Sequence, residues 1–197
     1  LLHAPATFGV TYLHFWHSMS GVAAEELGQL AGRFNASQPA YRVIPEFKGS
    51  YEQSLAAGMT AIRARNGPHI LQVFDAGTAA MMAAGGAFRP VHRIMTEAGE
   101  PFDTRAYMPA VRGYYADGKG KLLSLPFNTA TAVLFYNKDA FRKAGLDPAV
   151  APRTWREVQA AALQVRDSEA APCAYTTDWQ AWILVESLSA WHNEPLA

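Results

Sequence analysis

The N-terminal part of the chain alternates between short apolar runs and amphipathic segments. Residues 11–16 and 41–47 are rich in β-branched and aromatic side chains, which predicts two strands. Between them, apolar residues recur at helical spacing, which predicts a helix over about residues 22–35. Residues 70–74 are almost wholly apolar, as expected for a third strand that is covered on both faces.

Two further signals place helix starts after the second and third strands. Ser50 and Gln53 have the spacing of a capping box, which predicts a helix that begins there and ends near Asn66. Thr78 is expected to cap a helix over residues 79–84. Three strands, each followed by a helix, predict an α/β fold with a parallel-type sheet flanked by helices.

The predicted sheet also indicates where function should lie. Ligands of open parallel sheets bind beyond the carboxyl ends of the strands. In this chain those positions are residues 16–20, 48–51 and 75–78. We therefore expect functional side chains in these three segments.

The pattern changes in the second half of the chain. Residues 121–125 and 131–136 are predicted strands, and residues 126–128 between them are expected to form a crossover or hinge. A domain change is therefore expected near Asn128. Further elements are predicted beyond it, namely helices over residues 138–144, 154–165 (with Thr154 as its cap) and 179–191, and a strand near residues 174–176.

Composition and charge narrow the classes of function. Half of the residues are hydrophobic, only 17% are charged, and 17 basic residues balance 17 acidic ones. A nucleic-acid-binding protein normally carries a clustered basic excess, so no nucleic-acid partner is expected. No apolar run approaches the roughly 20 residues that cross a bilayer. Cys173 is the only cysteine, and we expect it to be a small buried hydrophobe rather than a reactive thiol.

Several local sequences resemble segments of the glycerol-3-phosphate-binding periplasmic proteins of bacterial ABC importers, within extracellular solute-binding protein family 1. The similarity runs in uninterrupted order from about residue 12 to residue 191. The more specific segments are KGSYEQ at residues 48–53 and LQVFD at residues 71–75. The others are FWHSM at 15–19, AAMMA at 79–83, PFN at 126–128, LFYNKDAF at 134–141, AGLDP at 144–148 and WQAWI at 179–183.

This resemblance implies a periplasmic binding protein-like fold, in which two lobes close on a solute. Residues 9–127 would form the N-terminal segment of the first lobe, and residues 128–197 the beginning of the second. Much of the second lobe, and the residues that hold the phosphate, would follow residue 197, so the chain is expected to be the N-terminal part of such a protein. The implied function is that of a monomeric periplasmic receptor, which passes sn-glycerol-3-phosphate or a glycerophosphodiester to the permease subunits of an ABC importer.

The resemblance also implies four substrate-binding positions. Tyr51 matches a solute-contacting tyrosine, and Trp179 matches a tryptophan that packs against the glycerol carbons. Asp75 matches a glutamate that accepts hydrogen bonds from solute hydroxyls, a role that suits a carboxylate because it only accepts when ionised. Ala130 stands where the family has a serine contact. The shorter acid and the missing hydroxyl indicate either a glycerophosphodiester as the solute or a tolerated exchange, with water in place of the serine.

The residues alone leave structural roles open for the same positions. Tyr51 would pack against the helix that it begins, and Asp75 would cap the helix that follows it. Trp179 would join Trp182 and Trp191 in the core. The location at strand ends favours function for Tyr51 and Asp75 independently of the resemblance.

Two other classes of function stay open on the residues. A sugar or oligosaccharide receptor of the same fold would use the acid and the tryptophan equally well. An enzyme would need clustered metal ligands or a Ser–His–Asp set, and the sequence indicates neither, so no catalytic residue, metal or cofactor is expected. His14 and His17 are three residues apart near a strand end without an obvious carboxylate partner, and we expect both to be packed or solvent-facing rather than metal ligands.

Overall fold

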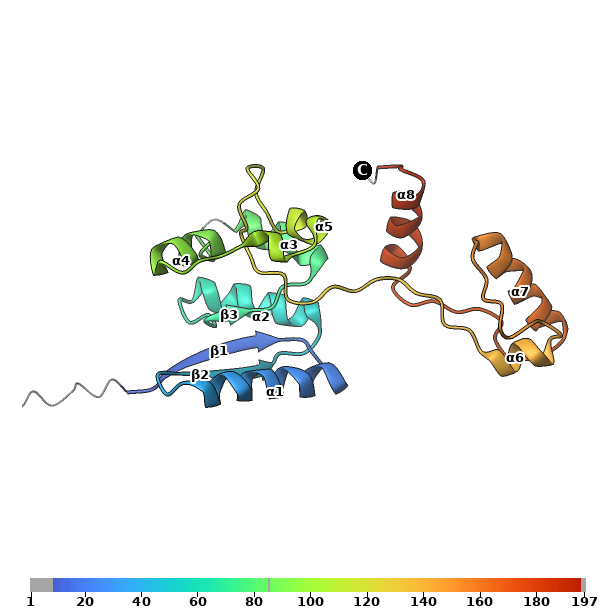
Figure 1. Cartoon of the computed structure of the whole chain (residues 1–197), viewed down its shortest axis with the longest axis horizontal. Helices are drawn as coiled ribbons and strands as arrows, with labels where there is room; N and C mark the ends of the chain where they lie inside the picture. Colours follow the sequence, from blue (N-terminus) through green and yellow to red (C-terminus); the bar gives the residue numbers. More distant parts are fainter. Residues whose placement is uncertain (1–8, 85, 196–197) are drawn as a thin grey trace, which may run out of the picture. The chain divides into compact units, whose positions relative to one another are not determined.

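A computed structural model describes residues 9–84 and 86–195 of the chain (Figure 1). The chain divides into two compact units, one that ends at Thr129 and one that begins at Ala130. Within the described ranges, no helix is both long and apolar enough to span a bilayer.

The first unit is built on a three-stranded parallel sheet, as the sequence predicts. The strands are β1 (Thr11–His17), β2 (Tyr41–Phe47) and β3 (Ile70–Leu71), in the order β2-β1-β3. The central strand, β1, is in register with β2 over its full length and pairs with β3 through Phe15 and Trp16. The carboxyl ends of all three strands therefore meet at one edge of the sheet.

Helix α1 (Gly21–Ser37) covers one face of this sheet. Its Leu27 belongs to a buried cluster with Phe15 of β1 and Met19, which follows that strand. Val43 of β2 packs against the same cluster. Because burial of a leucine side chain contributes about 1.5–3 kcal/mol, Leu27 is a principal attachment of α1 to the strands.

Helix α2 (Tyr51–Arg63) covers the opposite face. Its Gly58 lies so close to the sheet that a Cβ there would come within 2.6 Å of the Leu71 side chain. Leu71 pairs with Trp16, whereas the α1 side of the sheet carries Phe15. Successive residues of a strand point to opposite faces, so α2 packs on the face that carries Trp16.

The two helices begin where the sequence predicts but are capped differently. Ser50 Oγ accepts a hydrogen bond from Gln53 N (3.3 Å), and Gln53 Oε1 accepts one from Ser50 N (2.8 Å). The predicted capping box of α2 is thus confirmed. Ser20 occupies the equivalent position before α1, but its side chain makes no hydrogen bond to the first turn of that helix.

The third strand is shorter than predicted, and the next helix begins earlier. β3 ends at Leu71, and the following residues lead directly into α3 (Asp75–Ala83). The prediction that Thr78 caps this helix is wrong, because Thr78 lies inside it. Its Oγ1 donates to Phe74 O (3.1 Å), one turn back, which satisfies the hydroxyl without ending the helix.

The predicted strand over residues 121–125 is also wrong. Leu122 is fully buried, but it forms only an isolated antiparallel bridge with Ala116. The Leu122 carbonyl accepts a hydrogen bond from His92 N (3.1 Å), at the start of a helix. This backbone group is therefore satisfied without a neighbouring strand. The remaining helices of this unit are α4 (Val91–Ala98), the 3-10 helix η1 (Thr104–Ala106) and α5 (Pro109–Tyr114).

The second unit has its own small core between two helices. α6 (Lys138–Lys143) and α7 (Trp155–Asp167) meet through a buried cluster of Phe141, Ala144 and Val165. A capping box between Thr154 and Glu157 begins α7, as the sequence predicts for Thr154. A π-helix, η2 (Ala181–Glu186), leads without a break into α8 (Ser187–Trp191).

The two strands that the sequence predicts in the second unit are also wrong. Residues 131–136 and 174–176 form no regular element, although the first of these runs is strongly apolar. Phe135 in that run is 91% exposed. A strand requires a neighbour that completes its hydrogen-bond ladder, and the described residues of this unit provide none for either run.

Two burial predictions for this unit are also wrong. Cys173 is exposed, and its Sγ donates to Tyr175 O (3.1 Å). Trp191 is 86% exposed, so it does not belong to a core. It is the last residue of the short helix α8.

The two N-caps of the first unit give a matched test of helix capping. We expect Ser50→Ala to lower the free energy of unfolding by about 1 kcal/mol, because it removes one of the two reciprocal bonds of the capping box. Ser20→Ala should change it by only a few tenths of a kcal/mol, since no bond to the helix is lost. Urea denaturation of both variants measures the difference, and equal losses would contradict the assignment.

Candidate functional site

The loops at the carboxyl edge of the sheet are hydrogen-bonded to one another. Ser18, just after β1, donates from its backbone N to Gln72 Oε1 (2.9 Å) after β3. The Ser18 hydroxyl donates to Ser50 O (3.2 Å) after β2. One serine therefore connects all three of the strand ends, where the sequence predicts function.

Two buried polar side chains lie at this edge of the sheet. His17 and Gln72 are both more than nine-tenths buried. The Nδ1 atom of His17 accepts from Met19 N (3.2 Å), so it carries no proton in this arrangement. Burial lowers the pKa of His17 below its ordinary value, which favours the same neutral form.

The segment that leads toward the second unit is attached to the same edge. Phe127 packs edge-on against Phe15, with ring centroids 5.5 Å apart. Asn128 donates from its side-chain amide to the sulfur of Met19 (3.5 Å). Residues 126–128, which the sequence predicts as a crossover or hinge, are therefore held against the first unit by the contacts of Phe127 and Asn128.

Tyr51 and Asp75 lie close together at this edge. Each is the first residue of a helix, Tyr51 of α2 and Asp75 of α3. The Tyr51 ring stacks on Phe74, with centroids 5.5 Å apart and planes 17° from parallel. Phe74 directly precedes Asp75, which is exposed, so the stacked rings and the carboxylate belong to neighbouring residues of the chain.

The surroundings of Asp75 are aromatic and hydroxyl-bearing. Asp75 Oδ1 accepts from Ala76 N (2.9 Å), and the backbone carbonyl of Asp75 accepts from the Tyr114 hydroxyl (2.8 Å). Tyr115 packs edge-on against Tyr114. Burial is the largest cause that raises the pKa of the Tyr115 hydroxyl, and the nearby Tyr114 and Asp75 raise it further. A carboxylate with unused acceptor positions beside aromatic rings is suited to a neutral ligand with several hydroxyl groups.

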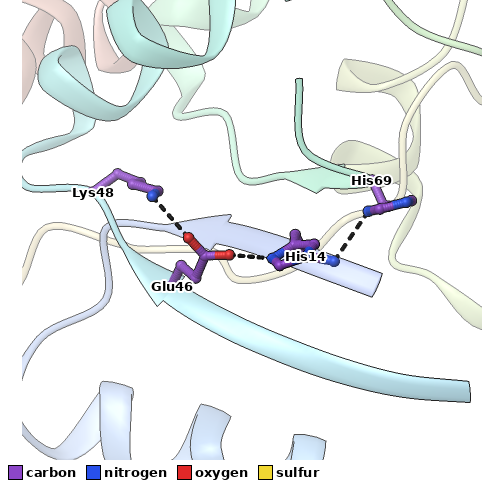
Figure 2. A network of polar contacts seen from close by, with 4 residues as sticks. All are labelled: His14, Glu46, Lys48 and His69. Carbon is purple, nitrogen blue, oxygen red and sulfur yellow. Dashed lines mark hydrogen bonds and ion pairs between the residues drawn. The ribbon is translucent and has the colours of Figure 1, made fainter. Parts of the chain in front are cut away.

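A row of polar side chains crosses the sheet behind this edge (Figure 2). Figure 2 shows Glu46 between Lys48 and His14, with His69 beyond His14. Glu46 Oε2 accepts from Lys48 Nζ (2.8 Å), and Glu46 Oε1 contacts His14 Nδ1. His14 therefore does have a carboxylate partner, which its position in the sequence does not reveal, and it is held by hydrogen bonding.

The other two predicted binding positions belong to the second unit. Ala130 is its first residue and is exposed, in a stretch without regular structure. Trp179 is half exposed and has a left-handed backbone (φ +50°), just before η2. Its ring packs edge-on against Trp182, with centroids 6.1 Å apart. Their roles as solute contacts stay predictions.

Two hollows of the second unit lie away from these positions. One of about 290 Å³ lies against α6 and α7 and is lined by residues such as Phe135, Phe141 and Val165. Another of about 320 Å³ is lined by Trp155 and Tyr175 along α7. None of the four predicted binding residues lines either of them. Across the described ranges, no three His, Cys, Asp or Glu side chains gather as metal ligands would.

Three residues at the edge were not singled out from the sequence. Ser18 lies inside the predicted segment 16–20 and Phe74 directly precedes the segment 75–78, so strand-end placement is a usable signal for both. Tyr114 carries no local signal, because it reaches Asp75 from 39 residues away in the chain. Such a contact depends on the tertiary packing of α5 and not on any pattern in the sequence.

The buried imidazole gives a pH-dependent prediction. An NMR titration of His17 should give a pKa below about 6.5, its ordinary value. The unfolded chain takes up this proton near pH 6.5 and the folded chain does not, so this histidine should make the free energy of unfolding fall as the pH drops below about 6.5. In His17→Asn this part of the pH dependence should disappear, and a titration midpoint above 6.5 in the native protein would contradict the prediction.

Comparison with known proteins agrees with this architecture. The chain matches the family model of the bacterial extracellular solute-binding proteins over residues 20–197. It is 50% identical over 189 residues to the sn-glycerol-3-phosphate-binding periplasmic protein UgpB of Yersinia pestis bv. Antiqua (strain Antiqua), and equally to UgpB of Escherichia coli (strain K12). Both alignments cover 95% of this chain and 43% of the relative, so the chain spans less than half the length of these relatives.

Among solved structures, CpMnBP1 with mannotriose bound is similar, with a TM-score of 0.64 and 25% identity. That match covers 79% of this chain and 38% of the other. The parallel sheet flanked by helices, the order of the elements and the family match lead to the same conclusion. The chain belongs to the family of bacterial extracellular solute-binding proteins.

Proposed function

We propose that this chain is the N-terminal part of a periplasmic receptor of an ABC importer. The receptor binds sn-glycerol-3-phosphate or a glycerophosphodiester between two lobes and delivers it to the permease subunits. It acts as a monomer, makes and breaks no covalent bond, needs no cofactor and has no nucleic-acid partner. The observation that carries the proposal is the position of Asp75, which is exposed at the start of α3 and directly follows Phe74, whose ring stacks on Tyr51 at the carboxyl edge of the sheet.

The chemistry of these residues supports a glycerol compound. The hydroxyl groups of a glycerol moiety donate hydrogen bonds, and the Asp75 carboxylate accepts them. The carbon skeleton of glycerol has apolar C–H faces, which pack on aromatic rings such as that of Tyr51. The names of the two UgpB relatives, at 50% identity, support the same solute class and the periplasmic location.

The second lobe is proposed to complete the site. Residues 9–127 form the N-terminal segment of the first lobe, and residues 128–197 begin the second. Trp179 would supply a second aromatic surface for the glycerol carbons. Ala130 would face the solute without a polar contact, which leaves room for the larger headgroup of a diester. The phosphate would be held by residues downstream of position 197, either by an arginine that neutralises it or by backbone amides that donate hydrogen bonds to it.

A sugar receptor of the same fold is the second candidate. The observation that favours it is the likeness to CpMnBP1 with mannotriose bound. An exposed acid beside aromatic rings also suits a saccharide, which presents hydroxyl groups and apolar ring faces. The two candidates differ in the phosphate group, which only the glycerol compounds carry.

Calorimetric titration of the full-length protein tests the proposal. We expect saturable binding of sn-glycerol-3-phosphate or of glycerophosphocholine, and none of mannotriose at the same concentrations. Asp75→Asn should weaken the binding by about tenfold or more, because it removes a charged acceptor of the solute hydroxyls.

Asp75→Glu is the matched control, since it keeps the charge and adds one methylene. It should retain binding and shift the preference toward the monoester, because the longer acid takes space from the diester headgroup. Tight binding of mannotriose without binding of either glycerol compound would replace the proposal with the sugar receptor.

A further inference from the structure

The row of polar side chains behind the binding edge is not explained by packing alone. Glu46, His14 and Trp16 lie on the α2 side of the sheet, since Glu46 pairs with Trp16 and His14 is two residues away on the same strand. Glu46 is partly buried, with 30% of its side chain exposed. The hydrogen bond from Lys48, followed by that from His14, lowers the pKa of the Glu46 carboxyl, so it is ionised at neutral pH.

The direction of each hydrogen bond follows from this charge. An ionised carboxylate only accepts, so His14 presents a protonated Nδ1 to Glu46. On the other side of His14, the His69 Nδ1 accepts from the backbone N of His14 (3.1 Å), so that nitrogen of His69 is unprotonated. The two imidazole rings stack, with centroids 5.8 Å apart. One carboxylate oxygen of Glu46 is therefore held by His14 of β1, and the other accepts a hydrogen bond from Lys48.

Lys48 is held at three points. Its ammonium group donates to Glu46 (2.8 Å) and lies 4.2 Å from the centroid of the Trp16 ring. Its backbone N donates to His17 O (2.9 Å). An ion pair and a cation–π contact on one partly buried ammonium are stronger than an exposed pair, because both partners are shielded from water.

Lys48 is also the first residue of the loop that carries Tyr51. Only Gly49 and Ser50 lie between them, and Ser50 is fixed by the capping box of α2. Gly49 has a left-handed backbone (φ +88°), and a Cβ there would collide with the Gln53 side chain. The loop therefore has a fixed conformation at each of its positions, and displacement of Lys48 passes directly to Tyr51.

We propose that Glu46, Lys48 and Trp16 are positioning residues, which hold the loop of residues 48–50 so that the Tyr51 ring stays stacked on Phe74 at the solute-binding edge. None of the three touches the solute. The inference rests on the proposed function for its effect on affinity, but the effect on the loop is independent of which solute is bound.

The test replaces Lys48 in the full-length protein. Lys48→Met keeps the aliphatic stem and removes the charge, and we expect it to weaken solute binding about tenfold, the loss expected when a shielded ion pair and a cation–π contact disappear. Lys48→Arg retains both contacts and should restore most of the affinity. Arg105→Met is the matched control, because it breaks the exposed ion pair with Asp103 in the same unit and should bind like the unchanged protein.

Hydrogen exchange without solute gives the second readout. Amides of residues 48–53 should exchange several-fold faster in Lys48→Met than in Lys48→Arg, whereas those of β1 should not change. Glu46→Gln, which keeps the volume of the side chain, should act in the same direction if Lys48→Met fails to fold. In the Tyr51→Ala background, Lys48→Met should cause little further loss of affinity, because the positioned ring is absent.

The outcomes separate the two proposals. If the unchanged protein binds neither glycerol compound, the proposed function fails, and hydrogen exchange still decides the positioning role. If it binds but Lys48→Met has unchanged affinity and unchanged exchange, the positioning role is overturned. A loss of affinity that Lys48→Arg does not restore would also overturn it, since that loss would not depend on the charge.

Discussion

The structure depends on how the carboxyl ends of three parallel strands satisfy their backbone groups. Where the ladder stops, N–H and C=O groups need new partners, since leaving them unpaired in a buried setting is costly. Here the residues that follow the outer strands supply partners for the end of β1: Lys48 N donates to His17 O, and Gln72 N donates to Trp16 O. The side chain of Gln72 then bonds to Ser18. Three separate loops thereby become one fixed edge, and the stacked pair Tyr51–Phe74 is part of it.

Local signals in the sequence predicted the first unit better than the second. The capping box at Ser50 is complete within four residues, and the strand β2 finds its partner in β1 of the same unit. Residues 131–136 have the same apolar and β-branched character, yet they form no strand, because a strand also needs a partner. The early start of α3 was missed for a related reason, since Thr78 satisfied its hydroxyl inside the helix instead of capping it.

The candidate site shows the same limit. Placement at strand ends was sufficient to select Tyr51 and Asp75, because the topology of a parallel sheet brings such positions to one edge. It could not select Tyr114, which reaches that edge from a distant helix, or the ion pair between Glu46 and Lys48 behind it. A sequence pattern predicts on which face of a helix or strand a side chain lies. It does not predict which side chains from other elements contact it on that face.

The exposed run of residues 131–136 affects how the chain behaves in concentrated solution. It combines high β-propensity with a lack of charge and proline, and Phe135 is almost wholly open to solvent. Segments with these properties pair with copies of themselves and assemble into intermolecular sheets. A preparation of residues 1–197 alone would therefore be limited by self-association through this run, and a charged substitution at Phe135 would act as a gatekeeper against precipitation.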